Sequence, residues 1–195
     1  MTTANKITIG RILAIPVLVA ALLYYADTGR EGFRWLALIS FAVAAVFDGV
    51  DGYVARRFNQ RSELGALLDP MADKLLLTTA LVLLTGANPN LQRIPLWLTI
   101  LVLGRDIILT AGAVIVHQVC GKVRIRPHFV GKIATVFQMA LVVWVMCKWP
   151  SEWLAWLVWG TALSTGISGA VYLTDGIRQL SASPISSPTP NQERK

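Results

Sequence analysis

The chain contains an acidic stretch that reads Asp48-Gly-Val-Asp-Gly-Tyr-Val-Ala-Arg56, then eight residues, then Gly65-Ala-Leu-Leu-Asp-Pro-Met-Ala-Asp73. The two quoted segments hold four aspartates, and apolar segments flank the stretch on both sides. Ionisable side chains within apolar spans are costly and usually functional. The solvent around those apolar segments therefore determines what the carboxylates can do.

The apolar segments point to lipid as that solvent. Of the 195 residues, 54% are hydrophobic and only 15% are charged, whereas soluble domains carry about 25% charged residues. A spanning helix needs roughly 20 mostly apolar residues, and six segments approach that length. We therefore predict an all-α, polytopic membrane protein with six transmembrane helices. These are expected at about 7–26, 33–58, 67–85, 94–116, 130–148 and 153–173.

The chain is expected to form one transmembrane domain over residues 1–180. Residues 181–195 are rich in Ser and Pro and lack an apolar pattern, which predicts a disordered cytoplasmic tail. The first apolar segment lacks a small-residue cleavage site, and Arg11 and Pro16 interrupt it, so we expect it to be retained rather than removed as a signal peptide.

Basic residues predict the orientation. Of the 18 Lys and Arg residues, four fall on one side of the predicted spans, one lies inside the fourth span, and the remaining thirteen fall on the other side. The four are Arg30, Arg34, Arg93 and Lys148. The richer side is cytoplasmic by the positive-inside rule. We thus expect a multi-pass protein of the cell inner membrane with both termini and the acidic stretch on the cytoplasmic side. The net charge of +7 suits anionic lipid, and no nucleic-acid-binding signature accompanies it.

The spacing of the acidic residues places them on helix faces. Asp48, Asp51, Gly52 and Ala55 follow i, i+3, i+4, i+7, and Gly65, Asp69 and Asp73 follow i, i+4, i+8. Two antiparallel helices joined by the short polar segment 57–64 would therefore bring the four carboxylates together.

Such a carboxylate cluster needs compensating positive charge. Hard divalent cations prefer oxygen ligands, and paired metals of this kind clamp a phosphate during displacement. The alternatives are an ion-coupled membrane transporter that uses the same acids, or separate acids satisfied by their neighbours. Gly52 and Gly65 on the acidic faces favour a site where a flat group approaches the backbone.

The stretch resembles the signature of the CDP-alcohol phosphatidyltransferase family, D-x2-D-G-x2-A-R-x8-G-x3-D-x3-D, at all eight defined positions. The resemblance implies that Asp48, Asp51, Asp69 and Asp73 bind two divalent ions, Mg²⁺ or Mn²⁺. It further implies that Asp73 acts as general base toward the attacking hydroxyl. Family members are typically homodimers, so a homodimer is expected.

The same resemblance implies a nucleotide site. Gly52, Ala55 and Gly65 would shape the cytidine pocket, and Arg56 would contact the diphosphate. CDP-diacylglycerol would then be the phosphatidyl donor and CMP the leaving group. This chemistry agrees with the carboxylate cluster, because phosphoryl-type transfer depends mostly on positioning and charge neutralisation.

Two cations are candidates for binding the acceptor alcohol. Arg105 lies inside the fourth predicted span beside Asp106, and Lys132 opens the fifth within Gly131-Lys132-x-x-Thr135. Arg105 either binds an acceptor phosphate, which its forked guanidinium suits, or forms a neutralised structural pair with Asp106. Lys132 either contacts the acceptor or snorkels to the membrane interface.

The residues leave two acceptor alcohols to be compared. The chain resembles the branch of the family that makes anionic glycerophospholipids, through Arg105-Asp106-Ile-Ile and the segment 126–135. In this branch the acceptor is glycerol-3-phosphate or, in CMP-forming cardiolipin synthases, phosphatidylglycerol. Glycerol-3-phosphate enzymes usually carry further cations where Ala113 and Ala134 stand, which leans toward the cardiolipin type. The short chain has the general character of the glycerol-phosphate enzymes, and phosphatidylglycerophosphate synthesis is the function we expect.

Overall fold

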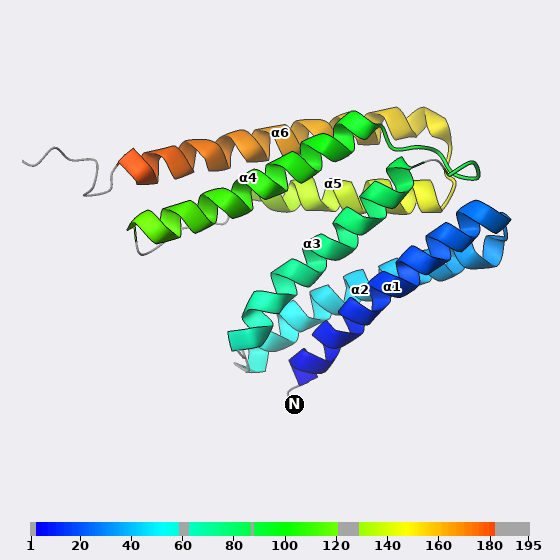
Figure 1. Ribbon diagram of the computed structural model, residues 1–195, viewed down its shortest axis with the longest axis horizontal. Helices are drawn as coiled ribbons and strands as arrows, with labels where there is room; N and C mark the ends of the chain where they lie inside the picture. Colours follow the sequence, from blue (N-terminus) through cyan, green and yellow to red (C-terminus); the bar gives the residue numbers. More distant parts are fainter. Residues whose placement is uncertain (1–2, 59–62, 87, 121–128, 182–195) are drawn as a thin grey trace, which may run out of the picture.

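All regular structure within the described residues of the computed structural model is helical (Figure 1). The structure describes residues 3–58, 63–86, 88–120 and 129–181, with side chains at 10, 12–47, 74–86, 88–112 and 129–177. Over these ranges the predicted all-α fold is confirmed. The helices are α1 (Thr3–Thr28), α2 (Glu31–Phe58), α3 (Glu63–Thr85), α4 (Leu96–Cys120), α5 (Phe129–Met146) and α6 (Ser151–Ser181).

Two of the helices are long and apolar enough to cross a membrane when only described residues are considered. They are Phe129–Met146, which is all of α5, and Ser151–Ile177 within α6. Shorter apolar stretches occupy Ile12–Thr28 in α1 and Lys74–Thr85 in α3. The arrangement with six membrane spans therefore stays a prediction.

The helices form two groups that α3 joins (Figure 1). α1 and α2 lie side by side, and α6 packs against both α4 and α5. α3 contacts members of both groups, α1 and α2 on one side and α4 and α5 on the other. The turns α1–α2, α3–α4 and α5–α6 lie together on the right of Figure 1, which we term the turn end. The adjoining ends of α2 and α3 lie at the opposite end of the molecule.

Helical periodicity explains which side chains form the core. Leu18, Leu22 and Tyr25 of α1 repeat at i, i+4, i+7 and are buried, as are Ala37 and Phe41 with Ala44 of α2. The core continues through α3, α4, α5 and α6 as one cluster. Each helix thus contributes one apolar stripe to a shared interior.

The opposite faces of the helices are apolar as well. Large hydrophobic side chains are exposed on every helix, for example Leu23, Ile39, Ile107, Val136 and Leu163. A soluble protein rarely leaves apolar patches of such extent open to water. This exposure is typical of helices whose outer faces contact lipid.

The α1–α2 turn depends on a glycine. Gly29 has a φ of 65°, and its N–H donates to the carbonyl of Tyr25 at 2.9 Å, which ends α1 in a left-handed cap. The Asn90 side chain packs against Gly29 and donates to the same Tyr25 carbonyl at 3.1 Å. The α3–α4 loop is thereby attached to the α1–α2 turn.

A cluster of charged and polar groups joins the same turn to the end of α5, and we call it the turn-end clasp: Tyr25, Glu31, Arg34, Met146 and Lys148. Arg34 bonds the Glu31 carboxylate and donates to the Met146 carbonyl at 2.7 Å. Lys148 Nζ lies 2.6 Å from Glu31 Oε1, and the Tyr25 hydroxyl donates to that oxygen at 3.4 Å. The clasp therefore connects α1, α2 and the α5–α6 turn.

The clasp shifts the acid–base behaviour of both its carboxylate and its ammonium group. Hydrogen bonds from Lys148 and then Arg34 lower the pKa of Glu31 from 4.5 to about 2. The hydrogen bond to Glu31, followed by that to Tyr25, raises the pKa of Lys148 above 10.5. The Glu31 contribution to stability is thus present above pH 4.5 and is lost as the pH falls toward 2, whereas the Lys148 contribution is lost only as the pH rises above 10.5.

We predict that Glu31→Gln lowers the thermal unfolding midpoint of the purified protein at pH 7 by a small amount, because the carboxylate is half-exposed and solvent screens it. The difference from wild type should shrink below pH 4.5 and vanish near pH 2. Circular dichroism melts across this pH range measure it. A Glu31 difference that persists unchanged at pH 2 would contradict the linkage.

Candidate functional site

The acidic stretch lies on two helices that run in opposite directions. The α2 backbone carries Asp48 and Asp51 one turn apart, and the α3 backbone carries Asp69 and Asp73 one turn apart. α2 and α3 contact each other, and only residues 59–62 separate their described ends. The predicted pair of antiparallel helices with a short connection is present (Figure 1).

The side chains of residues 48–73 lie outside the described residues. These include the predicted metal ligands and the predicted nucleotide-site residues Gly52, Ala55, Arg56 and Gly65. Among side chains that are described, no group of three or more His, Cys, Asp or Glu residues gathers to hold a metal. The convergence of the four carboxylates thus stays a prediction, supported by the helical backbone that carries them.

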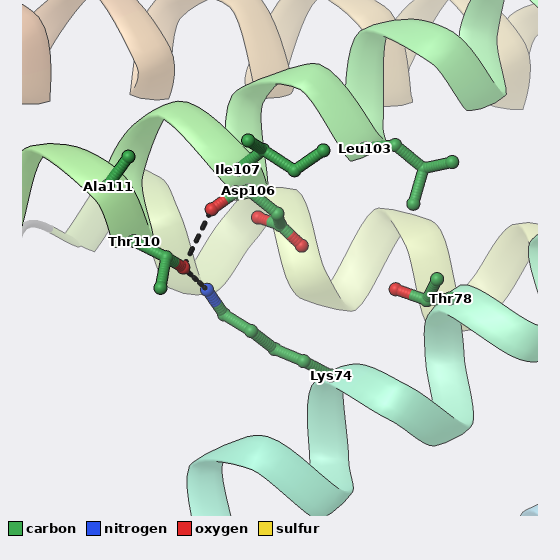
Figure 2. A pocket seen from close by; sticks show the side chains of 7 residues that line it. All are labelled: Lys74, Thr78, Leu103, Asp106, Ile107, Thr110 and Ala111. Carbon is green, nitrogen blue, oxygen red and sulfur yellow. Dashed lines mark hydrogen bonds between the residues drawn. The ribbon is translucent and has the colours of Figure 1, made fainter.

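A cavity of about 610 Å³ opens between α3 and α4 (Figure 2). One of its lining residues, Lys74, directly follows Asp73 in the sequence. Leu103 and Ile107 supply much of its apolar wall, while Lys74, Thr78 and Asp106 supply polar groups. The described residues that line it are Lys74, Thr78, Leu103, Asp106, Ile107, Thr110 and Ala111. The cavity is large enough for a small ligand or part of a lipid.

Polar contacts bridge the two walls of this cavity. Lys74 extends from α3, and its ammonium donates to the Thr110 hydroxyl of α4 at 3.4 Å (Figure 2). That hydroxyl donates in turn to the backbone carbonyl of Asp106 at 2.8 Å. The Asp106 carboxylate points from α4 toward the cavity. A positive and a negative group therefore face the same space beside the acidic stretch.

Arg105 does not line this cavity and is turned toward α6. Its Nη1 lies 2.7 Å from Asp106 Oδ1, and its Nη2 donates to the Ser168 hydroxyl at 2.6 Å. The side chain is 11% exposed and that of Asp106 is 18% exposed. The structure shows the ion pair with Asp106 that was one of the two alternatives for Arg105, and its role in binding an acceptor phosphate stays a prediction.

The start of α5 approaches Arg105 closely. A Cβ atom at Gly131 would lie 3.4 Å from Arg105 Nη2 and 3.2 Å from the Tyr172 hydroxyl. Lys132, the next residue, is exposed and its ammonium lies 5.6 Å from the centre of the Phe129 ring. The segment carrying Lys132 and the Arg105 side chain, which sequence analysis paired as acceptor candidates, therefore belong to one region.

The buried polar side chains of α6 were not among the residues predicted from the sequence. Thr161, Ser164, Thr165 and Ser168 repeat at i, i+3, i+4, i+7 and are all buried. Gln138 of α5 donates to the Thr165 hydroxyl at 3.3 Å, just as Arg105 of α4 donates to Ser168. The periodic small polar residues were a detectable signal of a helix seam.

The comparisons with known proteins agree with the helices and the acidic signature. The sequence profile of the CDP-alcohol phosphatidyltransferase family matches residues 1–165. The chain therefore belongs to the CDP-alcohol phosphatidyltransferase family, as its signature indicated.

Named relatives fall into two groups. The chain is 31% identical to the CDP-diacylglycerol–glycerol-3-phosphate 3-phosphatidyltransferase of Salmonella choleraesuis (strain SC-B67), over 76% of this chain and 78% of the relative. It is 32% identical to the protein of the same name from Escherichia coli (strain K12), over the same shares. It is also 33% identical to a CMP-forming cardiolipin synthase of Streptomyces coelicolor, over 84% of this chain and 77% of that protein.

The Arg105–Asp106 pair yields a stability prediction. Asp106→Ala leaves the guanidinium largely buried without its carboxylate, and breaking a buried pair in this way costs about 3–5 kcal/mol. We expect a clear drop in the thermal unfolding midpoint in detergent. The double variant Arg105→Met/Asp106→Leu removes both charges and should recover most of the loss. A double variant no more stable than Asp106→Ala would show that the unpaired charge is not the cause.

Proposed function

We propose that this protein transfers the phosphatidyl group of CDP-diacylglycerol to glycerol-3-phosphate and releases CMP. The observation that carries the proposal is the complete family signature, eight defined residues from Asp48 to Asp73, in a chain matched to the family over residues 1–165. The relatives from Salmonella and Escherichia support the choice of acceptor through the activity in their names. Family membership removes the support for an ion-coupled transporter, which rested on the acidic residues alone.

We propose that all six helices span the inner membrane, with both termini on the cytoplasmic side. The exposed apolar faces of the helices support this, as do helix lengths between 18 and 31 residues. The four basic residues assigned to the outer side lie in or near the turn end. The acidic stretch then lies at the opposite, cytoplasmic end, where CDP-diacylglycerol and a water-soluble acceptor can meet. We also propose a homodimer, which rests on the family resemblance.

The donor set suits divalent metal ions. Four carboxylates offer only hard oxygen ligands, which Mg²⁺ and Mn²⁺ prefer, and the helical backbone spaces them in two pairs one turn apart. We propose that Asp48, Asp51, Asp69 and Asp73 hold two such ions. When bound, the ions supply positive charge that offsets the diphosphate and the leaving CMP.

The remaining chemistry is assigned to side chains of this protein. Asp73 accepts the proton of the glycerol-3-phosphate hydroxyl as its oxygen forms a bond to the phosphorus of the phosphatidyl group. The bond from that phosphorus to the oxygen of CMP breaks at the same centre. Arg56 contacts the diphosphate, and Gly52, Ala55 and Gly65 shape the cytidine pocket.

The acceptor phosphate is assigned to two cations on α4 and α5. Arg105 offers the N–H groups that Asp106 and Ser168 leave available, and a guanidinium matches phosphate geometry better than an ammonium does. Lys132 is exposed one residue from the point where α5 meets Arg105. A dianionic acceptor would thus bind where α4, α5 and α6 meet.

A second candidate, transfer to phosphatidylglycerol, has specific support. The cardiolipin synthase of Streptomyces coelicolor matches the chain over a longer range than the other two relatives do. Two positions where glycerol-3-phosphate enzymes usually carry cations hold Ala113 and Ala134, and the Ala134 side chain is fully buried in α5. Fewer cations weaken the binding of a dianion.

The acceptor is determined by a direct assay. Purified protein with CDP-diacylglycerol and Mg²⁺ should release CMP when glycerol-3-phosphate is added and only at background level with phosphatidylglycerol. Removing the metal with a chelator should abolish CMP release. Release only with phosphatidylglycerol would transfer the assignment to cardiolipin synthesis, and no release with either acceptor would refute both.

We predict that Asp73→Asn lowers turnover by at least about 100-fold, because an amide cannot accept the proton, and general base catalysis contributes about 10²–10⁴-fold. CMP release under saturating substrates measures the effect. The thermal unfolding midpoint should stay close to that of the wild type. A fully active Asp73→Asn variant would remove Asp73 as the base.

A further inference from the structure

The guanidinium of Arg105 is held from two directions by very different partners. Asp106 is its neighbour in the same helix, so the contact between Nη1 and Oδ1 does not relate Arg105 to the rest of the molecule. Ser168 belongs to α6, and its hydroxyl accepts from Nη2 at 2.6 Å. Among described residues, this is the hydrogen bond that fixes the fork of Arg105 relative to a second helix.

Ser168 is well placed to fix an orientation. Its residue is 0% exposed, so water does not compete for the hydroxyl. Two other buried hydroxyls on α6 bond within their own helix: Thr161 donates to the Leu157 carbonyl at 2.7 Å, and Ser164 to the Gly160 carbonyl at 2.8 Å. The hydrogen bond of Ser168 instead crosses to α4.

Two glycines form close walls around the same side chain. A Cβ at Gly131 would lie 3.4 Å from Nη2, and a Cβ at Gly169 would lie 3.5 Å from Arg105 Cγ. The stem and the fork are therefore confined by α5 and α6. A confined fork loses little further freedom when it binds a ligand, which is the benefit of preorganisation.

The confined fork still has donors to offer. A guanidinium carries five N–H groups, and the two hydrogen bonds above engage two of them. Arg105 Nε is buried and has no hydrogen-bond partner among the described residues. A buried donor without a partner is costly, and a phosphate oxygen would satisfy it.

We propose that Ser168 is a positioning residue that orients the Arg105 guanidinium toward the phosphate of the acceptor. The proposal rests on the proposed function, in which Arg105 binds that phosphate. Ser168 itself does not touch the acceptor. It acts by holding Nη2, so that the Nε side of the fork stays directed at the ligand.

The test is a kinetic comparison in the full-length protein. Ser168→Ala should raise the KM for glycerol-3-phosphate roughly 10-fold, which corresponds to about 1.4 kcal/mol of binding. The kcat and the KM for CDP-diacylglycerol should stay close to wild type, because a KM effect alone reports binding lost equally from ground and transition states. Ser168→Thr retains a hydroxyl and should restore much of the acceptor affinity.

Ser164→Ala is the matched control. It removes a buried hydroxyl from the same helix, one turn earlier, whose hydrogen bonds go to α6 carbonyls. This variant should keep the wild-type KM for both substrates. If Ser168→Ala does not fold, Ser168→Cys tests the same idea, because its thiol fills the position but accepts a hydrogen bond only weakly, and it should raise the same KM.

The outcomes separate this inference from the proposed function. The wild-type assay first establishes which acceptor is used, and the KM comparison is made with that acceptor, since both candidates carry a phosphate. An unchanged acceptor KM in Ser168→Ala would overturn the positioning role. Equal effects of Ser168→Ala and Ser164→Ala on both KM values and kcat would also overturn it, since they would indicate a purely structural hydroxyl.

Discussion

The buried guanidinium of Arg34 makes the contact on which the arrangement of the helices depends. Arg34 is 8% exposed, and it joins the start of α2 to the Met146 carbonyl at the end of α5, while Glu31, which pairs with Arg34 within α2, receives Lys148 from the following turn. Asn90 attaches the α3–α4 loop to the α1–α2 turn, and Gln92 donates to the Trp149 carbonyl at 3.0 Å. All three turns are therefore linked at one end. The helices diverge from there toward the end that carries the acidic stretch, and this leaves room between α3 and α4.

The sequence was sufficient for the helices and for the family that the acidic stretch indicates. Long apolar runs ended at Gly29, at the loop beginning with Gly86 and before Pro150, and each of these lies in a turn of the structure. The reason is local: chain breaks depend on backbone conformations that a few residue types favour. The acidic spacing was equally local, because helical periodicity alone places Asp48 and Asp51 one turn apart.

Contacts between distant helices could not be predicted in the same way. Arg105 was assigned to a pair with Asp106 or to a phosphate, but its hydrogen bond to Ser168, 63 residues away in the sequence, could not be predicted. The cavity wall formed by Lys74 and Thr110 likewise joins two helices whose pairing no periodic pattern specifies. The reason for a small residue such as Gly131 can be inferred only when the side chains that pack against it are known. Packing between two helices depends on how well their surfaces fit each other, and no single segment of the sequence specifies both surfaces.

Because the turns are linked at one end, a small rotation of a helix at that end moves its other end by a larger distance. Arg34 and Asp51 are separated along α2 by a rise of roughly 26 Å. A rotation of about two degrees at the clasp would then displace the acidic residues by about 1 Å, and misplacement of reacting groups by that distance can cost about 100-fold in rate. Substitutions at the turn end can thus slow the reaction without touching any substrate, and screens for inactive variants should recover positions at both ends of the helices.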